Sequence, residues 1–445
     1  MNVRLSTDKI QLFSYFFIVS LMGSLLLSLP VAYKGGCKPD YVDALFTAVS
    51  AVCVTGLSTV SMGVYSNTGF FFIMLLIELG GLGIITIVAL YVVIPQRKMS
   101  LVNRRVVREF FIDDVETNPR KILRSIVTFT LVTQLAAACV LYRPFKEAGF
   151  TRPFFASLFH AVSAFCNAGF SLQDESLYLF RSSPLVLWTM MVLIVSGGIG
   201  FIVVTDIWHV LTRKRGRLSF HSSVALTVTC ILLVLGFLVP FLAEYTRALS
   251  PYSLPDKIML SFFQSVTPRT AGFSVLPQTA WSPVTHLFSL IFMFIGGSSG
   301  SIAGGIKTTT FAIVVMYALK GNTELKGLNL GKRNINSELI ERSFSIFAKS
   351  LMLVFFSVTL LVITESTALS AGVFRIFDVI YEVFSAFGTV GLSLGITGQL
   401  SFWGKTVIIL TMFIARIGLV AMALGFFRND RERFFEYPSA RVIVG

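Results

Sequence analysis

Eight apolar stretches dominate the 445-residue sequence and constrain its fold more than any other feature. Each is long enough to cross about 30 Å of hydrocarbon as a helix of roughly 20 residues. Hydrophobic residues make up 54% of the chain and charged residues 13%, which excludes an ordinary soluble domain. The sequence therefore predicts an all-α polytopic membrane protein. The stretches run approximately over residues 10–30, 70–95, 122–142, 184–210, 224–243, 284–320, 344–364 and 402–427.

The distribution of positive charge predicts the orientation of these stretches. Most of the 37 Lys and Arg residues lie at the two ends of the chain or in the segments after the second, fourth and sixth stretches. Lys and Arg are enriched in cytoplasmic loops of membrane proteins. We therefore expect both termini and these three segments to be cytoplasmic. The net charge of +14 then reflects topology, and nucleic-acid binding is not needed to explain it.

A short, less apolar segment recurs between the two stretches of each pair. Its four copies, too short to cross a bilayer, read DALFTAVSAVCVTGLS, FASLFHAVSAFCNAGFS, LSFFQSVTPRTAGFS and DVIYEVFSAFGTVGLS. Aligned on one glycine, all four have serine two positions later, and three have serine six positions earlier, where the third copy has Val266. Similarity that recurs at a regular interval indicates one structural unit used several times. The aligned glycines are Gly56, Gly169, Gly272 and Gly391.

The repeating unit is predicted to be a helix, a re-entrant half-helix, an extended glycine loop and a second helix. Each second helix carries a further motif of small residues, such as Gly80 to Gly83 in the first copy. The orientation above sends all four loops into the membrane from outside, so the repeats are parallel. The predicted repeats span residues 1–95, 121–210, 222–320 and 344–427, and a short cytoplasmic tail covers 428–445.

The four glycine loops predict a single central pore. Non-helical backbone is tolerated at membrane depth only where protein buries it or water fills a cavity. Glycine adopts positive φ without steric cost, so carbonyl groups can turn toward the pore axis. A ring of carbonyl oxygens can replace the hydration shell of a monovalent cation. The candidate filter residues are Val54, Thr55, Gly56, Asn167, Ala168, Gly169, Thr270, Ala271, Gly272, Thr389, Val390 and Gly391.

The stretch GGSSGSIAGGIKTTT, from residue 296, predicts a gate. It resembles a phosphate-binding loop, but Ile306 separates Gly305 from Lys307, and its apolar flanks do not form the strand-loop-helix context of such loops. We expect residues 296–305 to bulge into the cavity below the filter, whereas the other repeats keep intact helices. The alternative is close helix packing through small residues. The candidate gate residues are Gly296, Gly297, Ser298, Ser299, Gly300, Gly304, Gly305, Lys307 and Arg416.

Two cations lie within apolar stretches. An ionisable side chain at the bilayer centre costs about 2.5 to 3.5 kcal/mol on insertion scales, so Lys307 and Arg416 should face the interior of the bundle. Arg416 would lie below the filter and repel cations in transit. Lys307 has the alternative of extending to the cytoplasmic surface. Glu78 is a candidate partner for either cation.

The four repeats, the single glycine of each loop, the interrupted sixth stretch and the buried arginine resemble the superfamily of potassium transporters that includes TrkH, plant HKT and KtrB. The likeness covers nearly the whole chain and is strongest to the KtrB branch, since the chain starts with its first repeat. The resemblance implies K⁺ uptake across the bacterial plasma membrane that depends on Na⁺, either as a coupled ion or as an activator. It also implies a homodimer gated by an octameric cytosolic ring of KtrA-type subunits that bind ATP or ADP.

Other functions are weaker interpretations of this sequence. A secondary cation symporter with alternating access is the alternative, with the interrupted sixth stretch as its moving element. No Ser-His-carboxylate set or paired carboxylates recur at a shared depth, so no enzyme is predicted. The five cysteines lack CxxC spacing, and the chain lacks the Rossmann fingerprint, so we expect neither a metal site nor bound nucleotide.

Overall fold

The computed structural model describes residues 7–35, 39–93, 119–213, 215–320, 328–330 and 333–423. The predicted tail at 428–445 and the predicted ends of the first repeat at residues 1 and 95 lie outside these ranges. The end of the fourth repeat, at residue 427, also lies outside them.

Each of the eight predicted spans is helical. They form α1 (Thr7–Leu27), α3 (Asn67–Val93), α5 (Pro119–Glu147), α7 (Pro184–Ile199) with α8 (Phe201–Leu211), α9 (Phe220–Glu244), α11 (Pro283–Phe294) with α12 (Thr308–Lys320), α13 (Ser337–Thr364) and α16 (Phe402–Ala423). Among the described residues, three helices are long and apolar enough to cross a membrane, or four if the bent pair α7 and α8 is one span. The described apolar parts of the other helices are shorter.

Four shorter helices occupy the re-entrant segments. They are α2 (Tyr41–Val52), α6 (Pro153–Phe165), α10 (Leu254–Val266) and α15 (Ile376–Gly388), and each ends shortly before an aligned glycine. A single 3-10 turn follows each glycine loop, at Met62–Val64, Tyr178–Phe180, Gln278–Ala280 and Thr397–Gln399. The repeated sequence unit therefore folds as a repeated structural unit.

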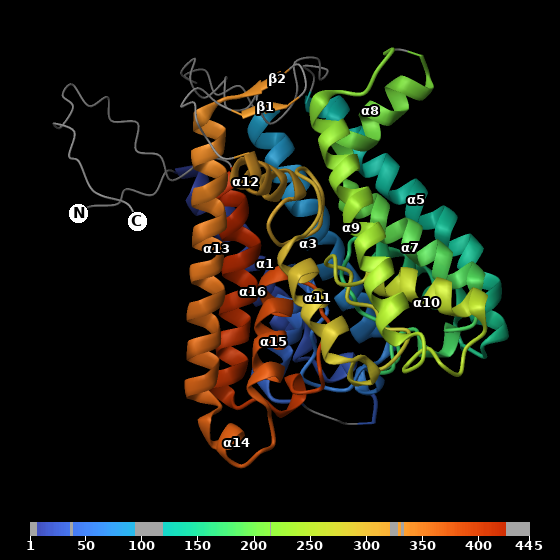
Figure 1. Cartoon of the computed structure of the whole chain (residues 1–445). Coiled ribbons are helices and arrows are strands. Elements are labelled where there is room, and N and C mark those ends of the chain that lie inside the picture. The colour runs from blue at the N-terminus through green and yellow to red at the C-terminus, as the bar shows by residue number, and fades with distance from the viewer. Residues whose placement is uncertain are drawn as a thin grey trace.

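The bundle has two distinct ends. A small antiparallel hairpin of β1 (Leu328–Leu330) and β2 (Arg333–Ile335) lies at one end together with α8, and α14 (Ser366–Ser370) lies at the opposite end (Figure 1). Helices α13 and α16 pack on one side, and α5, α7 and α9 lie on the other side (Figure 1). Of the four re-entrant, or pore, helices, Figure 1 labels α10 and α15, and both lie nearer to the α14 end than to the hairpin.

The helix of the second repeat is not intact, so the prediction of a continuous span over residues 184–210 is wrong. Helices α7 and α8 meet at a bend of 101°. Gly200 between them has φ of 92°, a left-handed conformation that an L-residue rarely adopts. The angle of the bend is filled by the segment around Gly300, as described below.

Aromatic contacts join the repeats through the core. Phe70 of α3 packs edge-on against Phe159 of α6, with ring centroids 5.5 Å apart. Phe294 at the end of α11 stacks on Phe387 of α15 at 5.4 Å. Aromatic pairs at these separations stabilise packing beyond the area they bury. These contacts join α6 and α15 to an outer helix of the preceding repeat.

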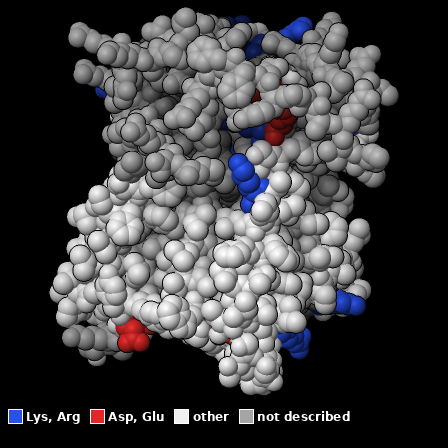
Figure 2. Space-filling model, turned by 90° about the vertical axis from the view of Figure 1, so that its left-hand side faces the viewer, with Lys and Arg blue, Asp and Glu red and all other residues white. Residues whose placement is uncertain are grey.

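The outer surface is apolar in the way a lipid-facing surface requires. On α13, Met352, Phe355 and Phe356 are each more than half exposed, at 70%, 74% and 61%. Figure 2 shows the face that contains α13: most of its described surface is uncharged, with a few charged side chains near the middle of the view and others toward its lower edge. Soluble monomeric proteins rarely expose so large an apolar face. It fits contact with lipid or with another membrane subunit.

Candidate ion pathway

The four glycine loops share an unusual backbone conformation. In each loop, the residue two positions before the glycine has positive φ: Val54 at 57°, Asn167 at 56°, Thr270 at 66° and Thr389 at 48°. The glycines themselves have φ of 95°, 71°, 75° and 94° in chain order. Positive φ is unfavourable for β-branched residues such as valine and threonine, and such strain persists only where the surroundings fix it. The same strain in four loops marks them as one functional element.

The four loops meet in cyclic order. An added Cβ on Gly56 would collide with the carbonyl oxygen of Ala168, and one on Gly391 would collide with that of Thr55. The same holds for Gly272 against Val390, and a Cβ on Gly169 would lie 3.0 Å from the carbonyl oxygen of Ala271. Each glycine therefore packs against the carbonyl that precedes the glycine of the next repeat. The residues predicted as a filter are brought together in one ring.

Hydroxyl groups on the pore helices hold each loop in place. Ser50 Oγ accepts a hydrogen bond from the Gly56 amide at 3.1 Å, and Ser385 Oγ accepts one from the Gly391 amide at 3.0 Å. In the second repeat, Ser163 donates to the carbonyl of Phe170 at 2.8 Å. These are the three serines of the aligned position. Such bonds stabilise an otherwise strained loop.

The third repeat, which has Val266 at that position, obtains its hydroxyl from the next residue. Thr267 Oγ1 donates to the carbonyl of Phe273 at 2.5 Å, the equivalent of the bond from Ser163 to Phe170. The shift of one residue explains why the alignment alone finds an exception. The function of the hydroxyl is kept although its position in the sequence moves.

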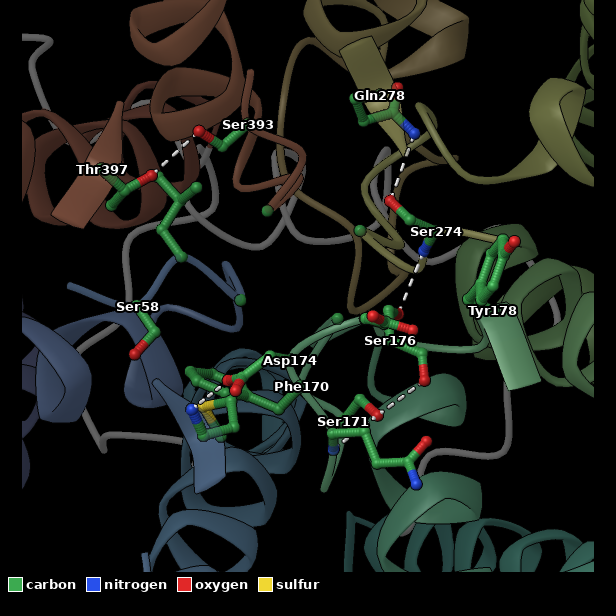
Figure 3. A pocket seen from close by; sticks show the side chains of 18 of the residues that line it. Ser58, Phe170, Ser171, Asp174, Ser176, Tyr178, Ser274, Gln278, Ser393 and Thr397 are labelled. Atoms are coloured by element: carbon green, nitrogen blue, oxygen red, sulfur yellow. Dashed lines mark hydrogen bonds between the residues drawn. The ribbon is translucent and has the colours of Figure 1, made fainter. Parts of the chain in front are cut away.

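Outside the ring lies a cavity of about 610 Å³ that all four repeats line. The four glycines form part of its wall, together with Asp174 and Glu175 from the loop after α6. Figure 3 shows the polar side chains of this cavity, among them Ser171, Ser274 and Thr397, gathered from loops of different repeats. Because polar side chains form part of its wall, a cavity of this kind can hold hydrated ions next to the ring of carbonyls.

Residues 295–307 form a loop that interrupts the helix between α11 and α12, as predicted. Its two ends are bonded to each other, because the Gly296 amide donates to the carbonyl of Ile306 at 2.9 Å and the Thr308 amide donates to that of Gly297 at 3.1 Å. Ser298 and Ser301 are buried within it. Backbone bonds across the neck give the loop a fixed shape.

The loop packs into the bend between α7 and α8. The Ser298 amide donates to the carbonyl of Gly198 at 2.9 Å, and the Phe201 amide donates to that of Gly300 at 3.3 Å. These are backbone groups that the break of the helix releases from their usual partners. On its other side, Gly304 packs directly against Thr389, two positions before the fourth glycine. The loop therefore lies against the base of the glycine ring.

Of the two predicted intramembrane cations, Arg416 contacts this loop from α16, and Lys307 is the last residue of the loop. Arg416 on α16 is 3% exposed, and its Nη1 donates to the carbonyl of Ile302 at 2.5 Å. Lys307 Nζ donates to the carbonyl of Ala303 at 2.6 Å. Arg416 is thus a buried charge held by a backbone dipole of the loop.

The expected ionic partner of these cations is not found. Glu78 contacts the thiol of Cys166 at 3.7 Å, and no ion pair within the described residues joins it to Lys307 or Arg416. The prediction that Glu78 pairs with one of them is therefore wrong. The backbone carbonyls of residues 302 and 303 accept hydrogen bonds from the two cations instead and so stabilise their charges.

Comparison with known families agrees with this architecture. A family model described as TrkH, a cation transport protein, matches residues 1–437. The chain belongs to this family. Its members are ion transporters, so the protein is a transporter and not an enzyme, and it is a multi-pass membrane protein.

Similar proteins cover almost the whole chain. The potassium/sodium uptake protein NtpJ of Enterococcus hirae is 37% identical over 100% of this chain and 99% of its own. The Ktr system potassium uptake protein B of Bacillus subtilis is 36% identical over 97% of this chain and 95% of its own. Among solved structures, the potassium transporter TrkH of Vibrio parahaemolyticus matches 96% of this chain and 87% of its own, with a TM-score of 0.71 and 18% identity.

Proposed function

We propose that this protein takes up K⁺ through the pore formed by its four glycine loops. The observation that carries the proposal is the cyclic packing of Gly56, Gly169, Gly272 and Gly391 against one another's neighbouring carbonyls. Relatives that share at least 36% of the sequence are named as potassium or potassium/sodium uptake proteins. The alternative, a symporter with alternating access, has no comparable feature in its favour.

The chemistry of uptake would follow from the carbonyls. Those of Thr55, Ala168, Ala271 and Val390 lie next to the glycines, and together they could replace the water around one K⁺ ion. Each loop contributes one glycine, so we expect a single stringent site. The loops differ in sequence, so the site should discriminate K⁺ from Na⁺ less strongly than a fourfold-symmetric filter would. Na⁺ would act as an activator of uptake.

Below the site, residues 296–305 and Arg416 would form the gate. The loop contacts Thr389 on the filter side, and the positive charge of Arg416 adds an electrostatic barrier to cations. Both would have to move for ions to pass. No step requires a nucleotide bound to this chain.

Control of the gate is assigned to other subunits. The name of the Bacillus subtilis relative places it in a multi-component system, the Ktr system. We infer that this chain forms a homodimer in the bacterial plasma membrane with both termini in the cytoplasm. A cytosolic octameric ring of KtrA-type subunits, which binds ATP or ADP, would act on the gate from that side.

Growth of a bacterium that lacks its own K⁺ uptake systems tests the proposal. The gene should restore growth at low K⁺, and a KtrA-type partner should improve the rescue. A variant with Gly272 replaced by Ser, which inserts in the membrane but carries a Cβ against the carbonyl of Val390, is the matched control and should rescue poorly. Absence of rescue by the parent protein in both conditions, with insertion confirmed, would contradict K⁺ uptake.

A further inference from the structure

Hydrogen bonds and an ion pair link the four repeats to one another around the cavity. The carboxylate of Asp174 makes the link between the first and second repeats. Asp174 Oδ2 accepts a hydrogen bond from Ser61 Oγ at 2.6 Å, and its Oδ1 accepts one from the Met62 amide at 2.5 Å. Both oxygens of the side chain are thus engaged by the neighbouring repeat. Hydrogen bonds to an ionised carboxylate are roughly twice as strong as neutral ones.

The other three junctions use different residues. Between the second and third repeats, Ser176 Oγ accepts from the Ser274 amide at 3.1 Å, and the Leu177 amide donates to the carbonyl of Ser274 at 2.9 Å. Figure 3 shows Ser176 and Ser274 side by side, with Gln278 bonded to Ser274. These contacts continue the chain of links from Asp174 around the cavity wall.

The circle closes through the fourth repeat. Tyr381 on α15 donates to Gln278 Oε1 at 3.2 Å, which joins the fourth repeat to the third. Lys405 at the start of α16 pairs with Asp43 on α2 at 2.6 Å, which joins the fourth repeat to the first. Every neighbouring pair of repeats around the ring is therefore bonded outside the glycines, two pairs through loops alone and two with side chains on helices.

Asp174 and Ser61 occupy equivalent places in their repeats. Each lies five residues after its glycine, Gly169 or Gly56, so a short stretch of chain connects this junction to the ring. At the ring itself, Gly56 packs against the carbonyl of Ala168. Because both residues of the junction lie only five positions from a ring glycine, their bond can fix the distance between the loops that contain Gly56 and Gly169.

We propose that Asp174 is a positioning residue for ion selectivity: by clamping the loop after Gly56 to the loop after Gly169, it sets the spacing of the ring carbonyls and favours K⁺ over Na⁺. This rests on the proposed function. K⁺ and Na⁺ differ in radius by a fraction of an ångström, so a small change in spacing alters which ion the carbonyls bind better. The side chain need not touch the ion.

The negative charge of Asp174 could also act directly by attracting cations into the cavity. The neighbouring residue Glu175 makes it possible to separate this effect of charge from the positioning effect. Glu175 lines the same cavity and is exposed, and its side chain makes no hydrogen bond or ion pair within the part of the chain that the structure describes. It offers equal charge without a link to the first repeat. Glu175→Gln is therefore a control for charge alone.

The test compares K⁺ and Na⁺ uptake by the full-length protein with its cytosolic partner in proteoliposomes, at low and high ionic strength. Ser61→Ala and Asp174→Glu keep the charge but disturb the clamp, and each should lower the preference for K⁺ about two- to tenfold, as expected for the loss of one such hydrogen bond. Glu175→Gln should keep the preference and slow uptake only at low ionic strength, because salt screens exposed charge.

The possible outcomes separate this proposal from the proposed function. If the parent takes up K⁺ but Ser61→Ala and Asp174→Glu both keep its K⁺ preference, Asp174 has no positioning role. The same conclusion holds if Asp174→Asn and Glu175→Gln have equal effects that vanish in high salt. If the parent transports no K⁺ at all, the proposed function fails, and the role of Asp174 fails with it.

Discussion

At the scale of single residues, the ring depends on strained positions that neighbouring groups hold. Val54, Thr270 and Thr389 adopt positive φ although each is β-branched, and buried hydroxyls fix the loops around them. A residue in such a region costs about 1 to 3 kcal/mol, which the rest of the fold must offset. The glycines cannot be replaced without moving a neighbouring carbonyl.

This arrangement predicts graded effects of Gly→Ser substitutions. Gly272→Ser and Gly391→Ser place a Cβ far inside contact distance of a carbonyl oxygen, whereas a Cβ at Gly169 would meet one at 3.0 Å. A strain of about 1 to 3 kcal/mol corresponds to a loss of K⁺ preference of about five- to hundredfold. Gly169→Ser should lose less of the preference for K⁺ than the other two variants. Competition between K⁺ and Na⁺ for uptake measures the order, and equal K⁺ preference in all variants would contradict the steric account.

At the scale of elements, the central feature is the packing of the loop at 295–307 into the bend of α7 and α8. Two interrupted helices satisfy each other's backbone groups, since neither could leave them unpaired at membrane depth. The bend between α7 and α8 is therefore structurally coupled to the loop at 295–307. It provides the binding place for the loop.

Gly200→Ala should disturb this place. Its Cβ would lie 3.0 Å from the carbonyl oxygen of Ser299 and from the carbonyl carbon of Gly300, and its φ of 92° is unfavourable for alanine. We expect the loop to be displaced and K⁺ flux through the purified subunit to rise several-fold. Gly216→Ala is the control, because nothing lies within 4 Å of its Cβ. Equal flux in the two variants would show that the bend does not hold the loop.

The sequence predicts the elements better than their contacts. The four re-entrant helices and the interruption near Gly300 follow from repetition and from a run of small residues. The bend at Gly200 does not, because the motif Gly197-Gly198-Ile199-Gly200 is equally typical of close packing in an intact helix. Asp174 is missed because, beyond the aligned serine, the outer loops share no sequence pattern. Thr267 is missed because its hydroxyl is displaced by one residue from the aligned position.

At the scale of the whole molecule, four parallel units surround one axis, and their loops enter from a single side. The positive charges of the segments after the second, fourth and sixth spans predict a cytoplasmic location for all three. Reporter domains fused after residues 110, 215 and 335 should all be cytoplasmic. An outside location for any of the three, measured by enzymatic or fluorescent reporter activity, would be incompatible with parallel repeats.

The proposed filter and gate are separate structures on one K⁺ pathway. Deleting residues 298–301 should leave the ring intact, since Gly304, which packs against Thr389, is kept, and the four ring glycines belong to other segments. The most direct measurement is K⁺ and Na⁺ flux into liposomes that contain the purified subunit alone, with insertion and dimerisation of the variant checked. We predict faster K⁺ flux than in the parent and the same preference for K⁺ over Na⁺. A variant that conducts no faster, or that loses its preference, would contradict the claim.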